Sequence, residues 1–248
     1  MQMHGNTILI TGGSNGIGLA LAKRLLALQN RVIICGRRED KLITAAEAIK
    51  GLLTIQCDVA DEAQRAALYE RVISEFPETN VLINNAGIQR RMDLDNPDVA
   101  WPDIKQELAI NLEAPIHFAR LFTAHFMKQR HPAIINVSSE LAFMPPIWVP
   151  VYGATKAGVH SFTFSLRKQL EHTGIAVVEV VPPAVNTDLG GVGMHTFGVD
   201  VDLFADEVIK GLTNGDIEIG YHNLDATRLP RTEIEQNAIA LWQRRKKA

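Results

Sequence analysis

The chain has 248 residues, 46% of them hydrophobic, and a formal net charge of -3 at pH 7. This length suits one large α/β domain, and a charge so close to balance gives no basic field that would recruit nucleic acid. The chain has two cysteines, no Cys-x-x-Cys motif and no apolar run of membrane-spanning or signal-peptide type, so we expect a reduced, cytoplasmic protein without disulfide framework, metal site or membrane span.

The chain opens with a strand, a glycine-rich turn and a helix. Residues 7–10 are a short apolar run, which predicts a strand buried on both faces. Thr11-Gly12-Gly13-Ser14-Asn15-Gly16-Ile17-Gly18 follows, and residues 19–28 have helical spacing. Glycines let the backbone approach a pyrophosphate, and a helix N-terminus supplies free N–H groups and the positive end of a dipole. We therefore predict a dinucleotide-phosphate loop, with an ordinary glycine-rich turn as the alternative.

The second predicted strand, residues 31–35, lacks the acid that usually follows it in dinucleotide sites. That acid binds the ribose 2'-hydroxyl, but here the chain continues Gly36-Arg37-Arg38. A guanidinium in this place fits a 2'-phosphate through charge-assisted, bidentate hydrogen bonds. The alternative is that Arg37 and Arg38 only begin a solvated helix.

Strand and helix patterns continue to alternate through the middle of the chain. After a strand over 52–56, Asp58 could accept a hydrogen bond from an adenine amino group, and Asp61 fits an ordinary helix N-cap. A strand over 81–83 leads into Asn84-Asn85-Ala86-Gly87, whose small and amide residues allow backbone to meet ligand. Arg90 and Arg91 follow, and either meet an anionic substrate or belong to a solvated loop.

A long helix is predicted over residues 103–128, and its apolar residues cover more than one stripe. Such a helix is buried on several sides, by its own sheet and by a partner chain. Beyond it we expect strands over 133–137, 175–181 and 217–221, and helices over 152–172 and 202–214. Glycine-rich residues 189–201 predict a mobile lid, and residues 230–248 a helical tail.

This alternation predicts an α/β fold. We expect a doubly wound, Rossmann-type, mostly parallel seven-stranded sheet flanked by helices, in a single domain over residues 1–248. Ligands of such sheets bind at the carboxyl ends of the strands, where every motif above falls.

Tyr152 and Lys156 begin the helix that follows Ser139 and lie one turn apart on one face. Free tyrosine has a pKa near 10. A neighbouring lysine cation favours the phenolate, so we expect the pKa of Tyr152 to fall toward the working range of a general acid or base. The Ser139 hydroxyl could hydrogen-bond a substrate oxygen. Alone, the pair would favour a solvated helix, where Tyr-x-x-x-Lys often occurs by chance.

The motifs Thr11-Gly12-x-x-x-Gly16-x-Gly18, Asn84-Asn85-Ala86-Gly87, Asn111, Ser139 and Tyr152-x-x-x-Lys156 together resemble the short-chain dehydrogenase/reductase family in its compact single-domain form. The likeness runs from residue 6 to about residue 221, and the combined set is far more specific than its parts. Pro182-Pro183 and residues 143–151 also resemble, more weakly, the branch of this family linked in bacteria to teichoic acid D-alanylation.

The resemblance implies roles for single residues. Tyr152 would donate or accept the proton, and Lys156 would lower its pKa and hold the nicotinamide ribose. Ser139 would polarise the carbonyl, and Asn111 would hold a water that links Lys156 to solvent. Together with the predictions above, the expected cofactor-binding residues are Gly12, Ser14, Asn15, Gly16, Ile17, Gly18, Arg37, Arg38, Asp58, Val59, Asn85, Ala86, Gly87, Tyr152, Lys156 and Thr187.

Three positions depart from the family pattern. Pro183 stands where glycine is usual, and proline has a fixed φ and no N–H, so contacts near the nicotinamide carboxamide should differ. Asn15 replaces the basic residue of many NADP-preferring members, and Glu140 follows Ser139 where apolar residues are common.

We therefore predict an NADP-dependent oxidoreductase, with NAD as the alternative cofactor. It would transfer hydride between the nicotinamide and a carbonyl or secondary alcohol. The alternative is a non-catalytic NAD(P)-binding redox sensor or partner module, although a pure binder needs neither Ser139 nor Tyr152. Apolar residues in 141–148 and 189–197 suit a substrate with an apolar part, and the resemblance implies a homodimer or homotetramer.

Overall fold

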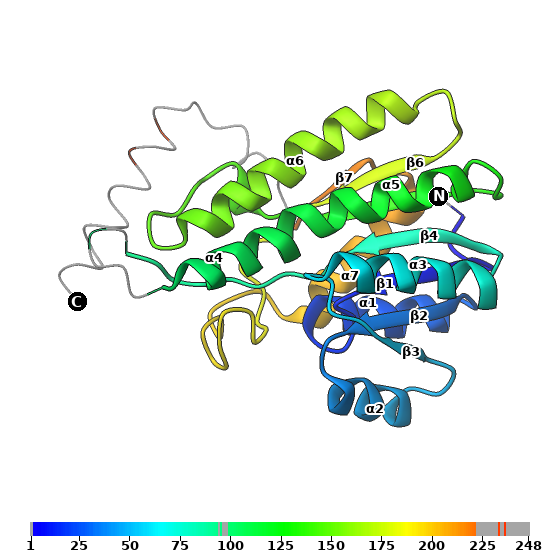
Figure 1. Cartoon of the computed structure of the whole chain (residues 1–248), viewed down its shortest axis with the longest axis horizontal. Helices are drawn as coiled ribbons and strands as arrows, with labels where there is room; N and C mark the ends of the chain where they lie inside the picture. The colour runs from blue at the N-terminus through cyan, green and yellow to red at the C-terminus, as the bar shows by residue number, and fades with distance from the viewer. Residues whose placement is uncertain (1, 94, 96–98, 222–232, 234–235, 237–248) are drawn as a thin grey trace.

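In the computed structural model, residues 2–93, 95, 99–221, 233 and 236 are described. They build a twisted sheet with helices on both of its faces (Figure 1). Strands and helices alternate along the described chain, as the sequence predicts.

The described sheet has seven strands, all parallel, in the order β3-β2-β1-β4-β5-β6-β7. The predicted doubly wound α/β fold is therefore confirmed, with a fully parallel rather than mostly parallel sheet. The order reverses between β1 and β4, and doubly wound sheets bind ligands at such a switch point. The strands are β1 (Thr7–Thr11), β2 (Arg31–Gly36), β3 (Leu53–Gln56), β4 (Thr79–Asn84), β5 (Ala133–Val137), β6 (Ala176–Val180) and β7 (Glu218–Ile219).

Two layers of helices cover the sheet. Helices α1, α2 and α7 pack on one face, and α3, α5 and α6 on the other. The helices are α1 (Gly16–Ala27), α2 (Glu39–Ala48), α3 (Glu62–Glu75), α4 (Trp101–Leu108), α5 (Ala114–Phe126), α6 (Pro150–Leu170) and α7 (Val201–Asn214). A π-helical turn η1 (Ala109–Glu113) joins α4 to α5, and a 3-10 turn η2 (Glu140–Ala142) follows β5.

The strands divide their side chains between two hydrophobic cores. Ile8 and Ile10 of β1 pack toward α1 and α7, whereas Leu9 packs toward α3 and α5. Successive side chains of a strand point to opposite faces, so a strand in the middle of a parallel sheet must be apolar at every position. This is why the short continuous apolar runs of the sequence are strands, and why β1, β2, β4 and β5 are buried almost throughout.

The predicted helix over residues 103–128 is wrong in detail, because its middle is a π-helical turn. Pro115 has no N–H, so residue 115 cannot make the α-helical hydrogen bond to the carbonyl of Asn111. Around this point the N–H of Ala114 bonds the carbonyl of Ala109 in π register. Single π turns inside helices occur frequently at functional sites.

Other bounds differ by a few residues. Helix α6 begins at Pro150 rather than at residue 152, because proline is favoured in the first helical turn. Strand β7 is shorter than the predicted 217–221. Of the predicted tail over 230–248, only residues 233 and 236 are described. No helix within the described ranges has both the length and the apolar character to cross a membrane.

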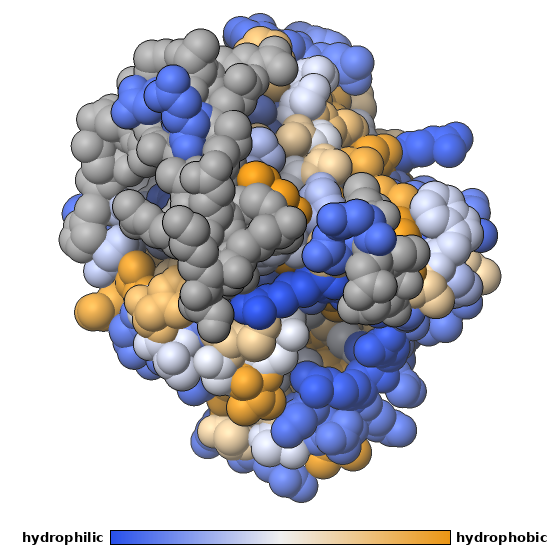
Figure 2. Space-filling model, turned by 90° about the vertical axis from the view of Figure 1, so that its left-hand side faces the viewer, coloured by the Kyte–Doolittle hydropathy of each residue, from blue (hydrophilic) through white to orange (hydrophobic). Residues whose placement is uncertain are grey.

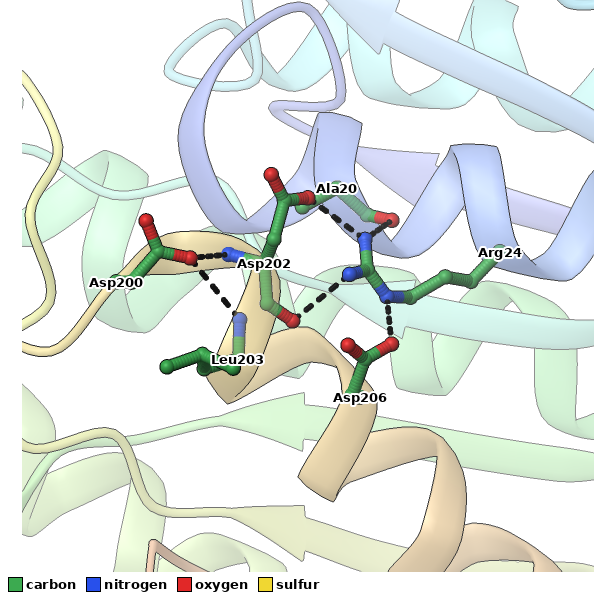
Figure 3. A network of polar contacts seen from close by, with 6 residues as sticks. All are labelled: Ala20, Arg24, Asp200, Asp202, Leu203 and Asp206. Atoms are coloured by element: carbon green, nitrogen blue, oxygen red, sulfur yellow. Dashed lines mark hydrogen bonds and ion pairs between the residues drawn. The ribbon is translucent and has the colours of Figure 1, made fainter.

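Arg24 ties α7 to α1 (Figure 3). Its Nη1 and Nη2 donate to Asp202 Oδ1 at 2.9 Å and Asp202 O at 2.8 Å, and its Nε donates to Asp206 Oδ1 at 2.5 Å. Asp200 caps the start of α7 by accepting from the N–H groups of Asp202 and Leu203. The chain between β6 and α7 is thereby held at one end beside the glycine-rich turn.

Candidate active site

The glycine-rich turn between β1 and α1 adopts a conformation that requires glycine. Gly12 and Gly16 have φ values of 64° and 55°, in the left-handed region. A Cβ on Gly12 would stand 2.7 Å from the Cα of Ala86, so this glycine lets the turn touch the chain after β4. The predicted loop thus meets the Asn84-Asn85-Ala86-Gly87 motif at the switch point of the sheet.

Thr11 and Asn85 join these two segments. The Thr11 hydroxyl oxygen accepts from the N–H groups of Asn85 at 3.0 Å and Ala86 at 3.1 Å. In return, Asn85 Nδ2 donates to the carbonyls of Thr11 at 3.0 Å and Gly12 at 3.1 Å. The amide of Asn85 therefore supports the loop, and a direct contact of Asn85 with a cofactor stays a prediction. Thr11 was not among the predicted site residues.

The N-terminus of α1 is suited to an anion. Asn15 caps it, accepting from the N–H of Gly16 at 2.8 Å, and the first turn carries no acidic residue. Helix N-termini bind phosphates through free N–H groups and the helix dipole. Thr187 lies alongside, because a Cβ on Gly16 would be 3.2 Å from Thr187 Cγ2. A cavity of about 250 Å³ opens here, with Asn15, Gly16, Thr187 and Asp188 in its wall.

The other residues predicted to contact phosphates, Ser14, Arg37 and Arg38, lie at the end of β2. Ser14 lies next to the end of β2, since a Cβ on Gly36 would be 3.3 Å from Ser14 Oγ. Arg37 and Arg38 are exposed, and in the described part of the chain neither guanidinium has a hydrogen bond or ion pair. Both are therefore available to an anionic ligand at this edge.

Asp58 and Val59 follow β3 on the same side. The Asp58 carboxylate accepts from the N–H of Ala60 at 3.0 Å, which fixes it in a turn. The carbonyl of Val59 accepts from Nη1 of the buried Arg65 at 2.7 Å. Asp58 and Val59 thus follow the strand that pairs with β2, and their contact with an adenine stays a prediction.

Asn111 holds the chain that follows β4. Its Oδ1 accepts from the N–H of Ile88 at 2.9 Å, and its Nδ2 donates to the carbonyl of Ile88 at 2.8 Å and to Thr155 Oγ1 at 3.3 Å. A Cβ on Gly87 would lie 3.6 Å from Asn111 Oδ1 and 3.7 Å from Lys156 Nζ. Gly87, Asn111 and Lys156 therefore converge, as the sequence predicts.

Ser139 sits in a turn fixed to the end of β6. The N–H of Ser138 donates to the carbonyl of Val180 at 2.8 Å, and that of Glu140 donates to the carbonyl of Pro182 at 3.0 Å. Ser139 Oγ accepts from the N–H of Leu141 at 3.1 Å. The unusual Pro182-Pro183 pair therefore contributes a carbonyl that positions the Ser139 turn.

The pKa of Tyr152 shifts upward, so the prediction that it falls is wrong. Burial raises the pKa of Tyr152 to about 12, outweighing the lowering effect of its hydrogen bond with Ser139, and the charge of Glu107 raises it further. Burial also lowers the pKa of Lys156 to about 8. The expected lowering of the Tyr152 pKa by the Lys156 cation is outweighed, because both groups are removed from water, which disfavours the charged form of each.

Some predicted site residues have other partners. Arg90 donates to the carbonyl of Asp103 at 3.1 Å and to Gln106 Oε1 at 2.6 Å, so it fastens the chain after β4 to α4. Arg91 is exposed. Glu140 is half-buried, and this burial raises its pKa. In the described residues, no group of three or more His, Cys, Asp or Glu side chains could hold a metal ion.

The predicted lid over residues 189–201 is a series of turns between β6 and α7, and its mobility stays a prediction. One parallel bridge, Val185 to Val199, closes its base. Its apolar side chains Val192 and Phe197 are 88% and 75% exposed. Figure 2 looks onto the edge of the sheet where the site lies and shows hydrophobic and hydrophilic residues interspersed over the described surface.

Glu107 is, with Thr11, a residue of this region that the predicted site residues do not include. It lies one helical turn before Asn111 and is 0% exposed. Burial raises the pKa of Glu107 to about 7. The available signal was its spacing: a side chain four residues before Asn111 shares the buried face of the helix.

Comparison with known proteins gives a consistent picture. The family model described as short chain dehydrogenase matches residues 6–193. A protein of Bacillus subtilis (strain 168) named uncharacterized oxidoreductase DltE is 46% identical over 233 residues, which cover 92% of each chain. The 3-oxoacyl-[acyl-carrier-protein] reductase FabG of Escherichia coli (strain K12) is 32% identical over 195 residues, covering 76% of this chain and 77% of that protein.

A solved structure is also similar. A short-chain dehydrogenase from Sphingobium yanoikuyae in complex with NADPH superposes with a TM-score of 0.81 at 25% sequence identity. The match covers 96% of this chain and 95% of the other.

Proposed function

This chain belongs to the short chain dehydrogenase family, and on that premise we propose that it is an NADP-dependent oxidoreductase. It transfers hydride between the nicotinamide and a carbonyl or secondary alcohol, with Tyr152 as general acid and base. The observation that carries the proposal is the meeting of Ser139, Tyr152, Lys156 and Asn111 beside the glycine-rich turn.

The residues at the switch point fit a nicotinamide dinucleotide. The N-terminus of α1, with Asn15 and Gly16, suits the pyrophosphate, and Thr187 lies beside it. Asp58 and Val59 lie on the adenine side, and when bound the cofactor supplies or takes the hydride. The NADPH complex of the Sphingobium yanoikuyae relative supports a cofactor of this class.

The chain's own residues handle the proton. Tyr152 is buried, with 5% of its surface exposed, so its phenol is shielded from bulk water. The raised pKa keeps it protonated at neutral pH, as a donor to a carbonyl oxygen must be. Ser139 lies close enough to hydrogen-bond the phenol and would orient the same substrate oxygen.

Arg37 supports the preference for NADP over NAD. It follows β2 where an acid would otherwise bind a ribose hydroxyl, and its exposed guanidinium has no partner among the described residues. A guanidinium binds a phosphate through charge-assisted bidentate contacts. Arg38 is the second candidate for the same contact.

For the substrate we propose a small carbonyl compound or alcohol with an apolar part, handled in the cytoplasm. The reductase FabG among the relatives acts, by its name, on a 3-oxoacyl group, which is a carbonyl compound. Exposed apolar side chains in the segment after β6, such as Val192 and Phe197, support an apolar contact with the substrate.

The test is a screen of NADPH oxidation over ketones, aldehydes and keto-acids, repeated with Tyr152→Phe on any substrate found. Loss of a general acid typically costs about 100- to 10,000-fold in rate, while cofactor affinity measured by calorimetry should stay close to wild type. Tyr69→Phe is the matched control, because Tyr69 packs edge-on against Phe122, away from the site. A Tyr152→Phe enzyme with half the wild-type rate would refute the proposal.

A further inference from the structure

Glu107 is a carboxyl group enclosed without a hydrogen-bond partner near Tyr152. The residue is 0% exposed, and both of its carboxylate oxygens are buried without a partner among the described residues. Buried polar groups in native proteins nearly always have a partner, so an exception requires an explanation. Nothing in the proposed reaction uses this group.

The helix that carries Glu107 packs against the helix that carries Tyr152. Glu107 lies on α4, and α4 packs against α6, the helix that carries Tyr152. One turn further along, Asn111 reaches α6 through its 3.3 Å contact with Thr155 Oγ1. The carboxyl therefore lies on the face of α4 that meets the start of α6, and the charge of Glu107 acts on Tyr152.

Residues 88–92, which follow β4, are fixed at both ends. Asn111 of η1 holds both backbone polar groups of Ile88, and the N–H of Met92 donates to the carbonyl of Trp148, before α6, at 3.1 Å. These residues therefore bridge η1 and the loop before α6, and Glu107, one turn before Asn111, has no exposed surface.

Few charged groups face Glu107. From the segment after β4, Arg90 lowers the pKa of Glu107 through its backbone N–H, which approaches the carboxylate outside hydrogen-bond geometry, and through its charge. The guanidinium of Arg90 is bound to α4. From α4 itself, Asp103 is 3.5 Å from that guanidinium. From η1, Glu113 is paired with Arg65, and from α6 the titratable neighbour is Tyr152.

We propose that Glu107 is a positioning residue that acts through Tyr152 by changing its own charge. A neutral Glu107 leaves the phenol free to ionise, whereas a Glu107 anion holds the proton on the phenol. The two groups then titrate as a coupled pair. The inference rests on the proposed role of Tyr152: ionising Glu107 favours carbonyl reduction, which needs the phenol, over alcohol oxidation, which needs the phenolate.

Desolvation sets where this change occurs. It raises the pKa of Glu107 to about 7, so the carboxyl changes charge near neutral pH. The anion in turn raises the pKa of Tyr152. In alcohol oxidation the rate should climb with pH, flatten as Glu107 ionises, and climb again.

Glu107→Gln tests the coupling, because glutamine keeps the shape and cannot ionise. The first measurement is carbon-13 NMR of ring-labelled tyrosine, with the Tyr152 signal assigned by its absence in Tyr152→Phe. In the wild type, the Tyr152 signal should shift as pH passes through about 7, and in Glu107→Gln it should not. Glu171→Gln, at an exposed position at the end of α6, should behave as the wild type.

The second measurement is the pH dependence of kcat/KM for alcohol oxidation. The wild type and Glu171→Gln should show the flattened region, and Glu107→Gln should lack it, with its upper limb displaced to lower pH because no anion holds the proton on the phenol. If glutamine prevents folding, Glu107→Met takes its place, since an apolar side chain of similar length suits a dry site.

Each outcome is decisive. The inference is overturned if the Tyr152 signal of the wild type does not shift near neutral pH. It is also overturned if the pH profiles of kcat/KM for the wild type and Glu107→Gln superimpose. NMR needs no substrate, so it tests the coupling independently of the proposed function. If the proposed function alone is wrong, the Tyr152 signal will still respond to Glu107, and Tyr152→Phe will stay active.

Discussion

Lys156 Nζ lies 5.6 Å from the ring centroid of Tyr152 and donates a hydrogen bond to the carbonyl of Val137 at 2.8 Å. Burial lowers the pKa of Lys156 to about 8 and raises that of Tyr152 to about 12. As pH rises, the ammonium therefore loses its proton long before the phenol does. In this arrangement Lys156 is an anchor on the end of β5, and its charge at neutral pH does not offset the burial that raises the pKa of Tyr152.

Lys156→Met should stabilise the fold at neutral pH and abolish turnover. For a base whose folded pKa is depressed, the penalty is full below the folded pKa of about 8 and disappears above the ordinary value of 10.5. Removing the base should raise the free energy of unfolding by roughly 2–3 kcal/mol at pH 7 and by little at about pH 10.5. Urea denaturation at the two pH values measures this.

The control for this experiment is Lys168→Met, whose side chain is 62% exposed on the same helix. It should change stability little at either pH. A stability gain in Lys156→Met that is equal at both pH values would show that the methionine packs better, and that the charge of Lys156 is not what costs stability.

Arg37→Ala should reduce the preference for NADPH over NADH and leave NADH affinity close to wild type. The proposed contact, a charge-assisted hydrogen bond to a phosphate, is worth about 1.5–3 kcal/mol, which is roughly one to two decades in dissociation constant. Calorimetric titration with both cofactors measures it. Arg38→Ala decides which guanidinium makes the contact, and the preference should survive Lys41→Ala on the first turn of α2. Equal wild-type dissociation constants for the two cofactors would contradict the proposal.

The sequence predicted the fold and the gathering of the site because those features have local causes. Ile8, Leu9 and Ile10 are apolar at every position, which is the mark of a strand buried on both faces. The motifs that follow β1 and β4 meet because parallel neighbours end at one edge. Gly87 follows β4 at that edge, where Asn111 of η1 and Lys156 of α6 approach it.

Features that depend on packing between distant segments could not be read from the sequence. The pKa of Tyr152 reflects burial, which no spacing reveals, and so the predicted direction was wrong. The buried Glu107 is a product of the packing of α4 against α6. The π turn at residues 109–113 had a local hint in Pro115, but the contact of its residue Asn111 with Ile88 joins segments far apart in the sequence.

Pro115→Ala tests whether that π turn serves the reaction. Alanine restores an N–H, which can donate to the carbonyl of Asn111 and draw the turn toward α-helical register. The side chain of Asn111 would then move relative to Ile88. We expect kcat to fall about tenfold, less than the hundredfold that a 1 Å misplacement can cost, with cofactor affinity retained. An unchanged kcat across pH would show that Pro115 serves packing alone.

Phe164→Glu should lower the oligomeric state. Large apolar side chains remain exposed on the helices of one face of the sheet: Phe164 on α6 at 58%, Trp101 on α4 at 64% and Met127 after α5 at 56%. Apolar side chains that gather in one exposed patch mark association surfaces, and the exposure of Phe164 on α6 is our reason to place the contact of the expected homodimer or homotetramer there. Leu203→Glu on α7, where Leu203 is 57% exposed on the opposite face, is the matched control. Light scattering at micromolar concentration should give a smaller mass for Phe164→Glu alone. A monomeric wild type would show that the chain does not associate. Equal masses for both variants would show that Phe164 is not at the association surface.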